Sequence, residues 1–379
     1  MIMAWVLALI VVGSVLFHLL NPWWITPLAS NWKAMDDTLT ITLVITGIFF
    51  VGINLFVVYA LLRYRHRPGS PRAAHEPESK ALERWLIGIT TVGIMALLAP
   101  GLVVYASYVK PPQDATVLEV LGQQWQWRFR LPGADGKLGL SETRHVSPTN
   151  PFGLDPADAA GQDDILIAEQ EVHLPLNKPV HVILRSHDVL HDFFVPPFRA
   201  RMNMVPGQIS TFWFTPTQVG RFEAMCSQLC GVGHPNMRAV VVVEDAANYQ
   251  AWLKDKETFA VTQRPPTGEG GQVAQGRALS NAKGCVACHS IDGSTRVGPS
   301  WKSLFGKTEN MRDGSTALVD DAYLGAFIRD PQARGVKGFP PVMPKIPLND
   351  EEVAALVAYI KSLGPTPPPA PPGEQKAQR

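Results

Sequence analysis

The chain has 379 residues, of which 46% are apolar, and a formal net charge of +1. This length allows two or three domains, and the balanced charge excludes the strongly basic character of a nucleic-acid-binding protein. The apolar residues are concentrated in the first 108 positions, so the two parts of the chain belong in different environments.

Three long apolar runs occupy positions 2–20, 39–62 and 85–108. A bilayer core of ~30 Å requires about 20 helical residues, and the second and third runs carry no charge over that length. We therefore predict two transmembrane helices there; a buried helical hairpin in a soluble protein is the alternative. The first run lacks the basic start of a signal peptide, so we expect a retained third span, with cleavage after "PLAS" (27–30) as the alternative.

A short arginine-rich loop, "RYRHRPGSPR" at 63–72, joins the second and third runs. Positively charged loops stay on the cytoplasmic side of a membrane. We therefore expect the long segment after Tyr108 on the periplasmic side of a bacterial inner membrane.

Beyond the membrane segment, runs rich in β-branched and aromatic residues predict strands at 180–185, 210–215 and 238–244. Several such strands indicate a β-sandwich or barrel. The intervening stretch 131–164 is rich in Gly, Pro, Asp and Asn and is predicted to be a surface excursion.

The C-terminal third is predicted to be helical, with the last helix capped by Asn349 and by Glu352 in a capping box. The predicted fold class is multi-domain: a transmembrane helical hairpin, a β-sandwich or barrel, and a small all-α domain. The expected segments are an N-terminal apolar segment (1–30), the hairpin (31–112), the β-domain (113–245), a linker (246–270), the α-domain (271–364) and a proline-rich tail (365–379).

The chain has four cysteines, in two close pairs: Cys226 and Cys230, Cys285 and Cys288. Two disulfides are one interpretation in an oxidising compartment, but each would close only a tiny loop and stabilise little. Each pair is also followed by a histidine, His234 or His289, which favours metal chemistry.

The second pair forms the C-x-x-C-H pattern of c-type haem attachment, with a redox-active dithiol as the alternative. Cys285 and Cys288 would bond covalently to the haem, and His289 would ligate the iron. A thioether is expected as the other axial ligand. Met343, in a proline-rich loop, is the best candidate; Met311 is the alternative, in a polar loop that we expect to be solvated. The α-domain is therefore predicted to be a cytochrome c.

The first pair lies in "CSQLCGVGHPNM" (226–237), which combines two thiols with an imidazole and a thioether. Zinc would need a closed set of four ligands, and a blue copper site would use only one thiolate. Two bridging thiolates suit two copper ions, each with one imidazole. The second imidazole would come from His187 or His191 in "SHDVLHDFFVP" (186–196).

These two stretches together resemble the dinuclear copper-A centre of cytochrome c oxidase subunit II, whose β-domain has a cupredoxin-like fold. The resemblance covers about 39–244, and a haem c domain fused to this subunit is a known variant. It leaves His187 as a polar neighbour of the site. The copper ligands that it implies are His191, Cys226, Cys230, His234, Met237 and the main-chain carbonyl of Gln228.

The stretch "GQQWQWRF" (122–129) is similar to the Gly-x-Gln-Trp-x-Trp segment of that family. The resemblance implies that electrons enter at Trp125. Strand alternation places Trp125, Trp127 and Phe129 on one face, so core packing is the alternative. In the family, the position of Gln228 is often a glutamate whose carboxylate also holds magnesium. Whether this chain has a magnesium site is therefore an open question.

The resemblance implies the electron-accepting subunit of a terminal respiratory oxidase. Electrons would pass from a donor cytochrome or other donor protein through haem c to copper A and on to subunit I, where oxygen becomes water. Expected partners are subunit I, other oxidase subunits and the donor, with no nucleic acid. The alternatives are the copper-A subunit of a nitric oxide reductase and a membrane-anchored copper carrier or redox sensor.

Overall fold

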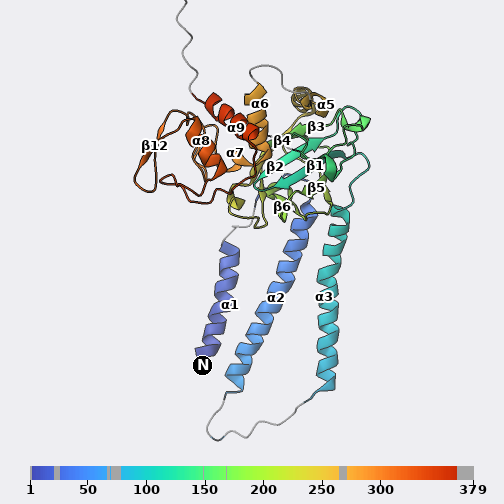
Figure 1. Cartoon of the computed structure of the whole chain (residues 1–379). Coiled ribbons are helices and arrows are strands. Elements are labelled where there is room, and N and C mark those ends of the chain that lie inside the picture. The colour runs from blue at the N-terminus through green and yellow to red at the C-terminus, as the bar shows by residue number, and fades with distance from the viewer. Residues whose placement is uncertain are drawn as a thin grey trace, which may run out of the picture.

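The computed structural model describes residues 2–20, 26–65, 69, 78–147, 149–167, 169–263 and 271–364. Figure 1 shows three long helices side by side below a compact part that contains the sheets and the C-terminal helices. The predicted proline-rich tail (365–379) and most of the arginine-rich loop (63–72) lie outside the described residues.

The three apolar runs are helices, as predicted: α1 (Ile2–Leu20), α2 (Lys33–Arg63) and α3 (Lys80–Tyr108). All three are long and apolar enough to cross a membrane. Their large apolar side chains are mostly exposed, which is stable only where lipid or another apolar surface covers them. The side chain of Ser79 caps α3 by accepting a hydrogen bond from Leu82 N, which places the helix start before the apolar run.

The β-domain consists of two sheets packed face to face. The first sheet has the order β3 (Ile165–Ile167), β2 (Gln126–Leu131), β1 (Thr116–Gln123), β5 (Val180–Ser186), β8 (Ser210–Phe214). The second has the order β4 (Glu171–Pro175), β10 (Arg238–Glu244), β9 (Gly220–Cys226), β6 (His191–Val195), β7 (Ala200–Met204).

The core between the sheets is aromatic, because alternate residues of each strand point inward. Trp127 and Phe129 of β2 are fully buried there, together with Phe193 of β6 and Phe212 of β8. Parallel pairing of β1 with β5 and of β4 with β10 joins strands that are distant in sequence. The prediction of a cupredoxin-like β-domain is confirmed.

The predicted surface excursion at 131–164 covers the outer face of the first sheet rather than lying free. Phe152 and Leu154 pack against Leu121 of β1 in a small second core. Arg130, also on the outer face, donates hydrogen bonds to Glu119 and Asp164 and is 1% exposed. Both faces of β2 are therefore buried.

The segment expected to be a linker, 246–270, is largely packed in its described part. It forms α4 (Ala246–Lys254) and α5 (Phe259–Thr262). Phe259 is fully buried and its backbone N–H donates to the Asp164 carbonyl at 2.7 Å. Trp252 stacks on the ring of His173 at 4.4 Å. The described part of this segment therefore packs on the β-domain, where its aromatic side chains bury apolar surface.

The C-terminal part has its own core around Leu279, Trp301, Leu356 and Ile360. Its helices are α6 (Gly271–Ala282), α7 (Cys285–Cys288), α8 (Asp321–Arg329) and α9 (Asp350–Ser362). A short hairpin of β11 (Thr308–Asn310) and β12 (Thr316–Leu318) adds to the predicted all-α fold. The predicted capping box of Asn349 and Glu352 is present at the start of α9.

Candidate copper centre and haem site

The candidate copper residues meet at one end of the second sheet. β6 begins at His191, and β9, its antiparallel neighbour, ends at Cys226. The loop 226–237 then leads from β9 to β10 and contains the short 3-10 turn His234–Asn236. The strands thus bring His191 to a loop that starts 35 residues later in the sequence.

Two thiols lie at the centre of this cluster, with an imidazole beside each. The Sγ atoms of Cys226 and Cys230 are 3.6 Å apart, far longer than the about 2.0 Å of a disulfide bond. His191 Nδ1 is 3.9 Å from the Cys226 sulfur, and His234 Nδ1 is 3.5 Å from the Cys230 sulfur. Met237 Sδ lies 3.8 Å from Cys230 Sγ.

These spacings fit ligands of transition-metal ions. Two atoms that each lie about 2.0 to 2.3 Å from one tetrahedral ion are about 3.5 Å apart. The main-chain oxygen of Gln228 is 3.1 Å from Cys226 Sγ and completes the set of six predicted donors. The ligand atoms of His191, Cys226 and Cys230 all lie within 4.8 Å of one another. Soft sulfur and imidazole donors favour copper or zinc over magnesium or calcium.

The electrostatics of the pair favour one thiolate. A hydrogen bond with Cys230 and another with His191 hold the pKa of the Cys226 thiol well below its ordinary value. The same hydrogen bond and burial raise the pKa of Cys230. A buried thiolate without a cation is costly, so the cluster is suited to a positively charged partner.

Asp188, which the sequence reasoning did not assign, orients His191. Its carboxylate lies 2.8 Å from His191 Nε2 and accepts hydrogen bonds from the backbone N–H groups of Gln124 and Val189, each at 2.7 Å. A carboxylate on the far nitrogen of a ligand histidine fixes its tautomer and leaves Nδ1 for a metal. The sequence signal for this role is the position of Asp188, an acidic residue three positions before the predicted ligand His191. His187, by contrast, is exposed.

Trp125 lies in the turn between β1 and β2, outside the strand alternation that buries Trp127 and Phe129. It is half-buried, and its indole Nε1 donates to the Cys230 carbonyl at 3.0 Å. Its ring lies so close to Gly233 that a Cβ there would come within 2.4 Å of it. Trp125 therefore packs on the loop that holds the thiols, not in the core.

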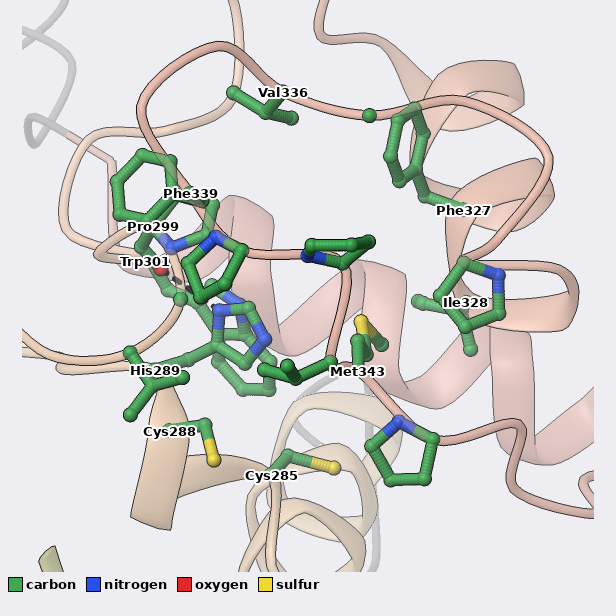
Figure 2. A pocket seen from close by; sticks show the side chains of 18 of the residues that line it. Cys285, Cys288, His289, Pro299, Trp301, Phe327, Ile328, Val336, Phe339 and Met343 are labelled. Atoms are coloured by element: carbon green, nitrogen blue, oxygen red, sulfur yellow. Dashed lines mark hydrogen bonds between the residues drawn. The ribbon is translucent and has the colours of Figure 1, made fainter. Parts of the chain in front are cut away.

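A second site is a cavity in the C-terminal domain. Figure 2 shows the side chains of Cys285, Cys288, His289 and Met343 around this cavity, as the haem prediction requires. His289 Nδ1 donates to the Pro299 carbonyl at 2.8 Å, and its ring stacks on Trp301 at 5.2 Å. This hydrogen bond leaves Nε2 free for iron.

Burial keeps the cysteines and the histidine that are predicted to bind haem uncharged. It lowers the pKa of His289, so the imidazole stays neutral, as metal ligation requires. It raises the pKa of Cys285 to about 12 and also raises that of Cys288. Both thiols are free, with no disulfide between them, and so remain available for attachment to a haem.

The two candidate methionines occupy different environments. Met343 lines the cavity, whereas Met311 is not among the residues of its wall. The expectation that the Met311 loop is solvated is wrong for Met311 itself, which is 1% exposed. Its backbone forms an isolated antiparallel bridge with Val336.

Two residues of the β-domain complete the cavity wall. Gln124 and Trp125, from the β1–β2 turn, line it together with Lys283 and Gly284 at the end of α6. The Trp125 side chain thus borders the haem cavity and also donates to the loop that holds the paired thiols.

Comparisons with known proteins agree with this architecture. The family pattern described as "Cytochrome C oxidase subunit II, periplasmic domain" matches residues 116–244, and the pattern "Cytochrome c" matches residues 273–364. Alternative cytochrome c oxidase subunit 2 of Bradyrhizobium diazoefficiens is 54% identical over 260 residues, 69% of this chain and 94% of that protein. Cytochrome c oxidase subunit 2 of Alkalihalophilus pseudofirmus is 25% identical over 335 residues, 86% of each chain.

The chain is also similar to a solved structure. The crystal structure of the periplasmic domain of subunit II of cytochrome oxidase from Bradyrhizobium japonicum has 25% identity and a TM-score of 0.28. The aligned region covers 38% of this chain and 95% of the chain in that crystal structure.

The chain belongs to the cytochrome c oxidase subunit II family, with a cytochrome c domain at its C-terminal end. It is a membrane protein and an electron-transfer subunit of the type found in oxidases.

Replacing either central thiol is expected to abolish the copper signal without removing haem. If both sulfurs bridge two copper ions, Cys226→Ser or Cys230→Ser should lose the mixed-valence two-copper spectrum while haem c still incorporates. Gln228→Ala is the matched control and should keep copper, since the predicted donor is its main-chain oxygen, which lies 3.1 Å from Cys226 Sγ. Electron paramagnetic resonance measures the outcome; a two-copper spectrum in either serine variant would contradict bridging thiolates.

Met343→Ala is expected to leave haem attached but to lower its reduction potential. Loss of a thioether ligand removes stabilisation of ferrous iron, so the fall should be on the order of 0.1 V or more, within the ~0.8 V that axial ligands span. Met311→Ala is the matched control and should leave the potential nearly unchanged. Redox titration of the haem band decides between them, and the reverse pattern would assign Met311 as the ligand.

Proposed function

We propose that this chain accepts electrons from a donor protein at its haem c and passes them through a dinuclear copper A centre to subunit I, where oxygen is reduced to water. His191, Cys226, Cys230, His234, Met237 and the Gln228 carbonyl would hold the copper, and Cys285, Cys288, His289 and Met343 would hold the haem. When bound, both groups supply reversible one-electron redox chemistry. We place the chain in the inner membrane of a bacterium.

The position of Trp125 carries this proposal. Its ring borders the haem cavity, and its indole N–H donates to the carbonyl of Cys230, one of the paired cysteines. Gln124 donates to the same carbonyl at 2.8 Å. A single packed side chain therefore borders both sites, which supports a role for Trp125 between haem c and copper rather than at an open donor surface.

The exposed apolar side chains of the copper loop (226–237) support the inference that another protein binds there. Leu229 is 77% exposed and Val232 is 57% exposed, both between or just after the two cysteines. Apolar side chains on a loop this close to a buried metal cluster are stabilised when another protein covers them. We assign this face to subunit I, and the helices α1 to α3 to the membrane part of the same contact.

Replacing Trp125 should slow electron transfer between the two centres while leaving both loaded. For Trp125→Leu we expect the rate of copper reduction by haem c to fall about tenfold or more, the equivalent of about 1.4 kcal/mol in activation free energy. Trp125→Phe keeps an aromatic ring and should lose less. Flash reduction of haem c followed by absorbance at the copper band gives the rate. An unchanged rate in Trp125→Leu would remove Trp125 from the route.

The acceptor can be tested on the complex purified from its native membrane. The relatives compared above are named as cytochrome c oxidase subunits, which supports oxygen. We expect steady turnover with oxygen and slower turnover with nitric oxide, measured with electrodes for each gas. Faster nitric oxide consumption would favour the nitric oxide reductase alternative, in which Gln228 accompanies a different catalytic subunit.

A further inference from the structure

The outer face of the β1–β2 hairpin contacts the C-terminal end of α6. The last carbonyl groups of a helix have no partner within the helix and carry the negative end of its dipole. Here the Asn281 carbonyl accepts a hydrogen bond from the Arg128 guanidinium, and the Ala282 carbonyl accepts one from Gln123 Nε2 at 3.1 Å. Two side chains of the β-domain therefore cap a helix of the cytochrome c domain.

Among the described residues, Arg128 has no carboxylate partner. It is only 4% exposed, yet it is absent from all ion pairs between described residues. Burial lowers its pKa to about 10, which still leaves it protonated at neutral pH. A buried cation requires compensation, and the negative end of α6 supplies it. Arg130, two residues further on the same face, is paired instead with Glu119 and Asp164 within the β-domain.

Gln123 is held in the orientation that this contact needs. Its side-chain oxygen accepts hydrogen bonds from Arg128 Nε at 3.4 Å and from Gln126 Nε2 at 3.3 Å. Its amide nitrogen is thereby directed towards Ala282. Gln123 and Gln126 are directly opposite in the β1–β2 register, so the hairpin itself places them together.

Gly284 lets the two domains approach closely. It has a φ of +72°, in the left-handed region that favours glycine. A Cβ at this position would lie 2.8 Å from the main-chain oxygen of Gln124. A larger residue would strain the backbone after α6 and push the domain away from the hairpin.

We propose that Arg128, Gln123 and Gly284 form a docking interface that seats the cytochrome c domain on the β1–β2 hairpin in one fixed position. Arg128 and Gln123 are positioning residues: they touch neither site's predicted ligands but align the haem cavity with Trp125. The purpose of the interface rests on the proposed function, whereas its existence can be tested without it.

A fixed seat differs from a tether in a measurable way. A domain on a flexible linker reaches its partner by diffusion at an effective concentration near ~1 mM for a short linker, so electron transfer would slow as solvent viscosity rises. A docked domain needs no such motion. Docking should also protect the backbone amides of residues 279–285 from hydrogen exchange. In an undocked domain these amides should exchange faster, whether or not electrons flow.

The test uses the full-length subunit in the assembled oxidase, with Arg128→Gln, Arg128→Lys and Gly284→Ala, and with Arg144→Gln as the matched control. Arg144 is an exposed arginine paired with Glu142 on the excursion. Hydrogen exchange at 279–285 and the rate of haem c to copper transfer, with and without added viscogen, are measured on the same samples. Copper and haem spectra confirm that each variant is loaded and folded.

We expect wild type and Arg144→Gln to show slow exchange and a rate that viscosity does not change. Arg128→Gln and Gly284→Ala should exchange about tenfold faster or more at 279–285, because a hydrogen bond to a charged group or the close approach is lost. Their transfer rate should fall and become viscosity-dependent, and Arg128→Lys should lie between. Gly284→Ala changes the other side of the interface, so it decides the matter if Arg128→Gln does not fold.

The docking interface would be overturned if hydrogen exchange at 279–285 and the haem c to copper transfer rate were unchanged in both Arg128→Gln and Gly284→Ala. A transfer rate that depends on viscosity in wild type would also overturn it. A different result would overturn the proposed function instead: protected exchange in wild type that is lost in Arg128→Gln, without any transfer from haem c to copper. The two failures are therefore distinguishable.

Discussion

One carbonyl group, that of Cys230, fixes the thiol loop (226–237) against the β1–β2 turn. It accepts hydrogen bonds from Gln124 and from Trp125, the two residues of the β1–β2 turn. Asp188 in turn accepts the Gln124 backbone N–H and lies against the imidazole of His191. The turn, the thiol loop and the ligand histidine therefore cannot move independently, and the haem cavity opens against the same turn.

The β-domain is also fixed to the membrane helices, not suspended above them. Arg199 donates two hydrogen bonds to Asp36 in the first turn of α2. The hydroxyl of Tyr108, at the end of α3, donates to the Arg201 carbonyl and accepts from its N–H. Trp32 packs edge-on against Tyr108. These contacts fix the position of the β-domain relative to the ends of α2 and α3.

Predictions from the sequence succeeded where the signal is local. The apolar runs predicted α1 to α3, because the thickness of hydrocarbon sets their length. The capping box predicted the start of α9 from two residues three positions apart. The predictions failed where burial depends on distant partners. Met311 is buried although its loop is polar, and the described part of the segment expected to be a linker packs because Phe259 meets a second core on the far side of the sheet.

The motifs in the sequence were sufficient to predict the chemistry of the two sites. The spacing of thiols, imidazoles and thioethers in two short stretches, and the resemblance built on them, was enough to predict copper and haem c. The spatial relation between the two sites became visible only in the folded chain. Folding moved Trp125 out of the strand alternation and onto the thiol loop, placed Asp188 behind His191, and buried Arg128 at the end of α6. These contacts join residues from different strands and domains, and a one-dimensional pattern does not encode which distant groups will meet.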